Sequence, residues 1–136
     1  MAEEGRPLPT LDVETRPFWE ACKRHELLVQ RCNDCGKFQY YPRAVCCHCL
    51  STNLEYRKAS GKGKVYTYSV VYINRSPGWD DKTPYVVAYV ELEEGVRMMT
   101  NIVGCDPEAV KIDMPVEVTF EDLSEEVALP VFKPAS

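Results

Sequence analysis

The stretch CNDCGKFQYYPRAVCCHC, residues 32–49, contains five of the seven cysteines of the chain and one of its two histidines. Four of these cysteines form two CxxC pairs that are separated by ten residues. A CxxC turn places two sulfurs on the same side of the backbone, and two such turns supply the corners of a tetrahedral thiolate site. Gly36 permits the positive φ that the first turn uses. The spacing therefore predicts one metal ion with the ligands Cys32, Cys35, Cys46 and Cys49.

The second turn bears on which metal this is. Four thiolates also hold iron in rubredoxin-like electron carriers. The second turn, CCHCL, lacks the matching glycine and carries Cys47 and His48, whose side chains we expect to point away from the metal. These features favour Zn²⁺, with an iron electron carrier as the alternative. Four thiolates leave no open coordination position, so the zinc is expected to be structural and to replace a hydrophobic core.

The residues around this cluster predict short secondary structure. Thr15 and Pro17 suit the start of a helix that ends near His25 or Glu26. The apolar patterning predicts short strands around the cysteines in residues 26–32, 38–41 and 54–59. From Gly61 onward, longer runs rich in Val, Tyr, Thr and Ile predict five more strands, in residues 63–73, 84–92, 96–103, 114–122 and 127–132.

These elements predict a mainly β protein with an N-terminal helix, a rubredoxin-like zinc ribbon and a five-stranded barrel of the OB type. A helical turn over 106–110, between the third and fourth long strands, favours the OB barrel, although a five-stranded sandwich fits the pattern nearly as well. The predicted division is an arm and helix over 1–31, the ribbon over 32–59, and the barrel with a C-terminal tail over 60–136.

Composition limits the possible settings and partners. No apolar run approaches the roughly 18 residues of a membrane span, and the acidic N-terminus lacks a signal core. We therefore expect a cytoplasmic protein, where clustered cysteines more often bind metal than form disulfides. Residues 20–64 contain nine Lys/Arg and four Asp/Glu, a net charge of +5, whereas the rest of the chain has a net charge of −10. This distribution suits a small anionic ligand better than a nucleic acid, which requires a broad basic face.

The sequence offers binding positions rather than an active site. The histidines both lie early in the chain, and no nucleophile or phosphate-loop motif is present; independent enzymatic activity is not expected. Tyr40 and Tyr41 are suited to stacking, and Arg43 to holding a phosphate. Trp79, on a long polar loop, is a candidate contact residue or else packs on its own barrel.

Several motifs together resemble a known family. They are the FWE helix, CxxCG followed by Tyr-Pro-Arg before the second CxxC, GKGKVY, and LEEGVRMMTNI with GCDP. The resemblance covers residues 17–133 and is to the OB-fold, acyl-CoA-associated zinc-ribbon family. Cys47 departs from the family pattern, which usually has proline there.

The resemblance implies a function. Members of this family are accessory subunits of thiolase-superfamily enzymes, among them acyl-CoA thiolases such as benzoylsuccinyl-CoA thiolase, and sterol side-chain aldolases. The implied role is a non-catalytic subunit that binds a thiolase-like catalytic partner in a hetero-oligomer and helps to form its CoA site. CoA would be a shared ligand, with Arg43, Lys62 or Lys64 near phosphate and Tyr40 or Tyr41 near adenine or pantetheine. The alternative is a module that binds single-stranded nucleic acid through an OB barrel.

Overall fold

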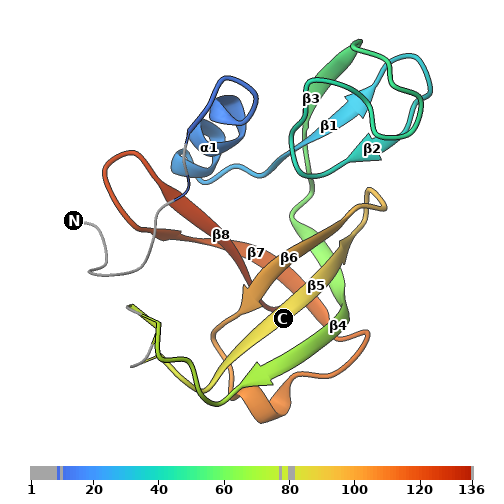
Figure 1. Ribbon diagram of the computed structural model, residues 1–136. Coiled ribbons are helices and arrows are strands. Elements are labelled where there is room, and N and C mark those ends of the chain that lie inside the picture. Colours follow the sequence, from blue (N-terminus) through green and yellow to red (C-terminus); the bar gives the residue numbers. More distant parts are fainter. Residues whose placement is uncertain (1–8, 10, 77, 80–81, 136) are drawn as a thin grey trace.

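The computed structural model describes Pro9 and residues 11–76, 78–79 and 82–135. These residues form one α-helix, a three-stranded sheet and a closed five-stranded barrel, in that chain order (Figure 1). The predicted mainly β class is confirmed. The arm expected over the first fourteen residues lies largely outside the described residues. No helix in the described part of the chain is long and apolar enough to cross a membrane.

The helix α1 spans Arg16–Lys23 and buries one apolar face. Thr15 occupies the N-cap position as predicted, but its side chain does not cap the helix. Instead, the Thr15 backbone N–H and hydroxyl both donate to Asp12 Oδ1 at 2.9 Å. The helix ends before His25, whose φ of 61° is left-handed and stops the hydrogen-bond ladder. The buried face consists of Phe18, Trp19, Ala21 and Cys22.

The ribbon is the sheet β2–β1–β3, in which the central strand is antiparallel to both neighbours. Its strands are β1 (Leu28–Cys32), β2 (Phe38–Gln39) and β3 (Leu54–Lys58). All three predicted strands are present, and β2 is shorter than expected. Within residues 32–58 the buried side chains include no large aliphatic residue; they are Cys32, Gln39, Pro42 and Cys46.

The barrel has the strand order β4–β5–β6–β8–β7, and β7 pairs with β4 to close it. This closure confirms the OB-type barrel and excludes the sandwich. A 3₁₀ turn, η1 (Pro107–Ala109), lies between β6 and β7 as the sequence predicted. The strands are β4 (Lys62–Val71), β5 (Tyr85–Leu92), β6 (Arg97–Ile102), β7 (Pro115–Asp122) and β8 (Ala128–Pro134).

Two glycines explain the GKG entry into the barrel. Gly61 has a φ of 79°, and a Cβ placed on it would lie 2.6 Å from Val118 Cγ1. At Gly63 a Cβ would lie only 2.4 Å from the backbone oxygen of Glu91. At Gly63, β4 pairs with β5 on one side and β7 on the other. Both positions therefore need glycine so that the barrel can close tightly.

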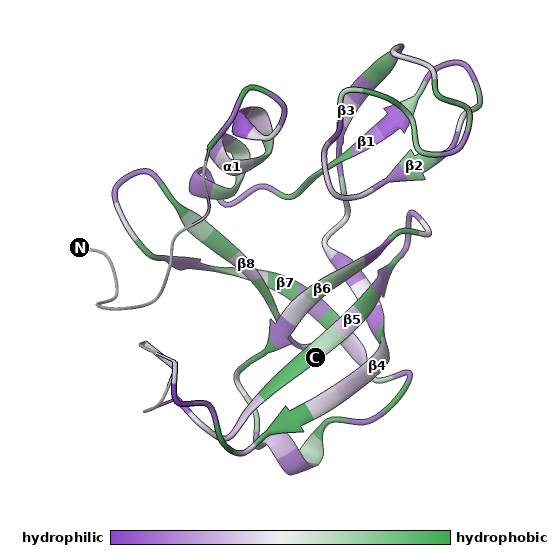
Figure 2. Ribbon diagram, viewed as in Figure 1, coloured by the Kyte–Doolittle hydropathy of each residue, from purple (hydrophilic) through white to green (hydrophobic). Residues whose placement is uncertain are grey.

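One apolar core joins the three parts of the chain. Phe18 and Cys22 of α1 belong to the same cluster as Val29 of the ribbon and Phe132 of the barrel. Figure 1 shows α1 beside the β7–β8 hairpin and at the entry to the ribbon. Figure 2 shows that β5, in the barrel wall between β4 and β6, is apolar along most of its length. The helix therefore packs against both the ribbon and the barrel.

A polar clamp holds the end of α1 on the β7–β8 hairpin. Lys23 Nζ donates to Asp122 Oδ1 at 3.2 Å and to the backbone oxygen of Ser124 at 2.8 Å. The His25 ring stacks on Phe120, and its Nε2 lies 3.2 Å from Asp122 Oδ1. His25 and Lys23 together lower the pKa of the Asp122 carboxyl below its ordinary value of 3.8.

This lowered pKa predicts a dependence of stability on pH. A carboxyl whose folded pKa lies below its unfolded value stabilises the fold above the unfolded pKa, and this contribution disappears as the pH falls through the folded pKa. The stability difference between wild type and Asp122→Asn should therefore be constant near pH 5 and shrink below about pH 4. Urea unfolding at a series of pH values measures it. A difference that persists unchanged at pH 2.5 would show that Asp122 does not act through its charge.

Candidate metal centre and ligand-binding positions

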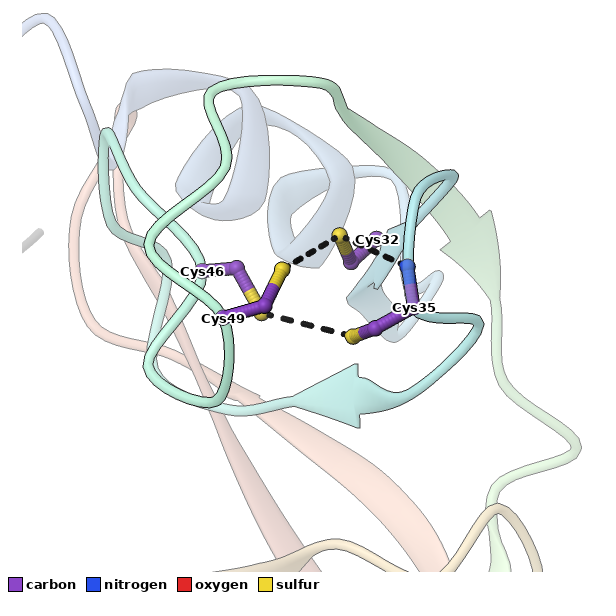
Figure 3. A group of neighbouring side chains, drawn as sticks. All are labelled: Cys32, Cys35, Cys46 and Cys49. Carbon is purple, nitrogen blue, oxygen red and sulfur yellow. Dashed lines mark hydrogen bonds between the residues drawn. The ribbon is translucent and has the colours of Figure 1, made fainter.

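The four cysteine sulfurs of the two CxxC pairs converge between the two turns (Figure 3). All four lie within 4.8 Å of one another. The sulfur of Cys32 lies 3.6 Å from that of Cys49, and the sulfur of Cys35 lies 3.7 Å from that of Cys46. Each short sulfur–sulfur distance therefore joins a cysteine of the first turn to a cysteine of the second.

This arrangement fits a zinc ion. With zinc–sulfur bonds near 2.3 Å, the edges of a sulfur tetrahedron measure about 3.8 Å, which agrees with the two cross-turn distances. The backbone N–H of Cys35, at 3.5 Å, lowers the pKa of the Cys32 thiol to about 7 and so favours the thiolate that a metal requires. Cys47 and His48 are exposed and do not belong to the group of converging sulfurs. The four cysteines are positioned for a zinc-ribbon site, and zinc would supply a structural cross-link there.

The two turns share one backbone conformation although only the first contains glycine. The N–H of Gly36 donates to the Cys32 carbonyl at 2.8 Å, and the N–H of Leu50 donates to the Cys46 carbonyl at 3.0 Å. Gly36 has a φ of 77° and Leu50 a φ of 66°. The second turn therefore keeps the geometry of the first with leucine in place of glycine. The lack of a glycine there does not distinguish zinc from iron.

Leu50 adopts this left-handed conformation at an energetic cost because its Cβ crowds the following carbonyl. Its side chain is 76% exposed and therefore recovers little packing energy. Leu50→Gly is expected to raise the free energy of unfolding of the zinc-loaded protein by about 0.5–1 kcal/mol. Leu50→Ala is the control, since alanine keeps the strain and should give no such gain. Equal stabilities of the two variants in guanidinium unfolding would contradict the strain at Leu50.

A pair of buried amides ties the second turn to the ribbon. Gln39 Nε2 donates to Gln30 Oε1 at 2.7 Å, and Gln39 Oε1 accepts from the Cys47 backbone N–H at 2.8 Å. Gln30 exchanges two hydrogen bonds with the backbone of Arg43, at 2.9 and 3.0 Å. Buried polar side chains of this kind fix the position of the metal ligands beside them. Sequence reasoning missed the pair; its one signal was a glutamine at an inward-facing position in each of two short strands.

The expected ligand-binding residues of the ribbon have different surroundings. Tyr40 is largely buried, with its ring 5.6 Å from that of Phe18, and burial raises the pKa of its phenol above the ordinary range. The Tyr41 hydroxyl accepts from Trp19 Nε1 at 2.9 Å. Both rings therefore pack against α1, whereas the Arg43 side chain is exposed.

The other expected positions lie at the two ends of β4. Lys62 and Lys64 are exposed at its start and line a hollow of about 610 Å³. Lys64 Nζ lies 4.0 Å from a Glu91 oxygen and 3.8 Å from one of Asp113. Trp79 follows the other end of β4, with its ring centroid 4.8 Å from that of Tyr85. The structure thus brings Lys62 and Lys64 together but places Trp79 and the Arg43 loop elsewhere.

Two cysteines outside the cluster behave as packing residues. Cys22 is fully buried, and this burial raises the pKa of its thiol to about 12. Partial burial and the nearby Asp106 also raise the pKa of the Cys105 thiol. Raised pKa values disfavour the thiolate, so neither cysteine is activated as a nucleophile.

Comparisons with known proteins agree with this architecture. Residues 19–55 match the family model "ChsH2, rubredoxin-like zinc ribbon domain", and residues 56–121 match "ChsH2, C-terminal OB-fold domain". A "DUF35 domain-containing scaffold protein" of Methanocaldococcus jannaschii is 44% identical over 79% of this chain and 77% of its own length. A "Probable enoyl-CoA hydratase alpha subunit" of Thermomonospora curvata is 39% identical over 96% of this chain, which spans only 40% of that protein. The "Benzoylsuccinyl-CoA thiolase subunit BbsA" of Geobacter metallireducens is 34% identical over 66% of this chain and 58% of its own length.

Solved structures show the same fold. A chain of the "Ltp2-ChsH2(DUF35) aldolase" superposes with a TM-score of 0.84 and 38% identity, and the match covers 95% of this chain and all of that one. A Sulfolobus solfataricus protein of the DUF35 family superposes with a TM-score of 0.59 at 16% identity, which shows likeness of fold alone; that match covers 88% of this chain and 83% of the other. The matches to both domain models and to the DUF35 scaffold protein establish that this chain belongs to the ChsH2/DUF35 family, in which a rubredoxin-like zinc ribbon precedes an OB-fold domain.

Proposed function

We propose that this chain is a non-catalytic, zinc-containing accessory subunit of a thiolase-superfamily enzyme. In this role it binds the catalytic subunit and supports thiolytic or retro-Claisen/aldol cleavage of carbon–carbon bonds in CoA thioesters. The observation that carries the proposal is the match, over 95% of the chain, to a subunit of the Ltp2–ChsH2(DUF35) aldolase. The names of the thiolase and hydratase relatives also refer to CoA thioesters.

The chemistry of the described residues supports a non-catalytic role. The four cysteine sulfurs face one another, so a metal bound there has no open position for a substrate. The thiols of Cys22 and Cys105, which lie outside this group, have raised pKa values. The catalytic groups would therefore come from the partner. We further propose that the chain works as a single unit with three parts. These are the arm and helix over 1–31, the metal ribbon over 32–59, and the barrel with its tail over 60–136.

We also propose that the chain helps to form the CoA site through two lysines at the start of β4, in a hollow that Glu91, Glu93 and Asp113 also line. Lys62 and Lys64 line the 610 Å³ hollow, where they could meet phosphate. Their position favours them over Tyr40 and Tyr41, whose rings pack on α1. Arg43 lies on a separate loop and would act independently.

The role is tested by purifying the tagged chain from its own host and identifying its partner by mass spectrometry. A stoichiometric complex with a thiolase-like chain, active on CoA thioesters when neither subunit is active alone, is the expected result. A chain recovered alone, or full activity of the partner without it, would overturn the proposal.

The CoA site is tested separately in the intact complex. Lys62→Ala and Lys64→Ala are expected to weaken CoA binding measured by calorimetry, and Arg43→Ala provides an independent measurement at the ribbon. Lys111→Ala, an exposed lysine on another loop, is the matched control. CoA affinities equal to wild type in all four variants would leave the subunit role intact and remove the CoA role.

A further inference from the structure

The outer surface of strands β4, β5 and β6 carries no charge over most of its length. On each strand, outward residues alternate with core residues, and the strand register aligns them: Thr67 lies opposite Tyr89, which lies opposite Met99. We call this surface the uncharged face; it consists of Thr67, Ser69, Val71, Tyr85, Val87, Tyr89, Met99 and Asn101. The chain as a whole is 27% charged, so eight adjacent outward positions without a charge are unusual for a solvated surface.

Large apolar side chains stand out from this face. Met99 is 59% exposed, and Tyr89 and the neighbouring Tyr66 are each 45% exposed. With side chains of roughly 200 Å² each, these three leave about 300 Å² of largely apolar surface in contact with water. Contiguous patches of that size on a monomer are often functional. The same face also contains a shallow hollow of about 200 Å³, which Thr67 and Tyr89 help to line.

The charges at the edge of the face are paired with one another. Arg97 Nε lies 3.2 Å from Glu91 Oε1, and the Arg97 guanidinium carbon lies 3.8 Å from the centre of the Tyr66 ring. Lys64 approaches the same glutamate at 4.0 Å. These pairings leave a polar rim with little net charge around an apolar centre, which is the usual anatomy of a protein–protein interface.

The opposite side of the barrel differs. The outward positions of β7 include two acids, Glu117 and Glu121, and α1 packs beside the β7–β8 hairpin, held there by the Lys23–Asp122 contact. Within the described part of the chain, the helix therefore covers one side of the barrel, whereas Tyr89 and Met99 at the middle of the uncharged face are exposed and only Tyr85 at its end contacts the Trp79 ring.

We propose that the uncharged face is the surface on which the catalytic subunit docks; this inference rests on the function proposed above. The face lacks the lysines and arginines that nucleic acid requires. Its 300 Å² is well below the roughly 800 Å² that each partner gives to a standard interface, so it would form the apolar centre of a larger contact. A self-pairing dimer built on this patch alone would be too small. A solved structure that matches 95% of this chain is named as an assembly with a second protein, Ltp2, and the catalytic subunit is therefore the occupant that we assign.

The test places a charge at the centre of the face. Met99→Lys and Met99→Glu are made in the full-length zinc-loaded chain, and their affinity for the purified catalytic subunit recovered with wild type is measured by calorimetry. Both variants should weaken binding at least about tenfold, because either sign of charge is desolvated in an apolar contact. Ile112→Lys and Ile112→Glu are the matched controls, since Ile112 is 54% exposed and lies on the loop before β7. They should bind within about twofold of wild type.

A second variant separates loss of binding from loss of stability in the Met99 variants. Ser69→Lys changes an exposed position on β4 without removing an apolar contact, and it should weaken binding in the same direction with an unchanged melting temperature. Wild-type affinity in both the Met99 and the Ser69 variants would overturn the docking surface while leaving the subunit role in place. A wild-type chain that binds no catalytic subunit would overturn both. A self-associated wild type that Met99→Lys converts to monomers with undiminished partner binding would assign the face to a second copy and overturn the proposal.

Discussion

A Cys46→Ser variant is expected to retain far less zinc than the wild-type chain, which should retain about one zinc per chain. Its ribbon strands, β1 to β3, should lose protection from amide exchange, because residues 32–58 bury no large aliphatic side chain that could replace the metal. The apparent binding free energy of a structural zinc is roughly 10–16 kcal/mol in small domains, and it is also folding free energy. The barrel should stay protected because the shared apolar core that fills it includes none of the four ligand cysteines.

The control for this experiment is the neighbouring thiol. Cys47→Ser removes one cysteine from the same turn, but Cys47 is exposed and lies outside the group of four. It should keep the wild-type zinc content and exchange pattern. Metal analysis and mass-resolved hydrogen exchange on the same samples measure both effects. Equal zinc content in the two variants would contradict the assignment of Cys46 as a ligand.

Phe18→Ala should cause the second large effect, a loss of about 3–5 kcal/mol in the free energy of unfolding. Phe18 is fully buried, and its ring centroid lies 5.0–5.7 Å from the rings of Trp19, Tyr40 and Tyr41. Removing it leaves a cavity where α1 meets the ribbon, and three rings that are fixed by one another cannot readily fill it. Urea unfolding monitored by tryptophan fluorescence reports the loss, because Trp19 lies in the same cluster.

Phe18→Leu provides the comparison, since leucine keeps most of the volume and should lose less than half as much stability. Met99→Ala, at an exposed position on the barrel, should change stability by under about 0.5 kcal/mol. A loss below 1 kcal/mol in Phe18→Ala would mean that the aromatic cluster does not hold the helix to the ribbon.

The fold could be predicted from the sequence because its two strongest signals are local. The CxxC spacing identifies the ribbon without knowledge of any distant contact. The alternation in residues 96–103 predicts a strand with two distinct faces, and the structure buries the face with Met98, Thr100 and Ile102. The closing pair between β4 and β7 is non-local, and for this reason the sequence favours the barrel only narrowly over a sandwich.

The binding positions were harder to predict because a residue type does not reveal its neighbours. Tyr40 and Tyr41 follow the first CxxC turn, and the sequence predicts that they meet a ligand or partner. It does not reveal that α1, from earlier in the chain, supplies a ring against which both pack. Leu50 shows the same limit in the backbone, since a leucine gives no sign that its turn is left-handed.

The uncharged face did have a signal in the sequence. In YVVAYVEL the inward residues are apolar, as a barrel strand requires, but the outward Tyr85, Val87 and Tyr89 carry no charge either. A strand with a solvated outer side would place polar residues there. Apolar character on both sides of a strand in a barrel this small therefore indicates that something outside the core covers it.

The closure of the barrel is uneven. β7 and β8 pair along Val116–Asp122, whereas β6 and β8 meet at one parallel register pair, Ile102 opposite Phe132. The β6–β8 seam is thus the most weakly paired junction of the barrel. Separating β6 from β8 is expected to cost less free energy than unfolding a hairpin that is paired along its length. The outward Met99 lies on the same strand, β6, three residues before the seam residue Ile102. A neighbour bound at Met99 would therefore press on the strand whose pairing closes the barrel, and the β6–β8 seam is where the barrel would first respond to it.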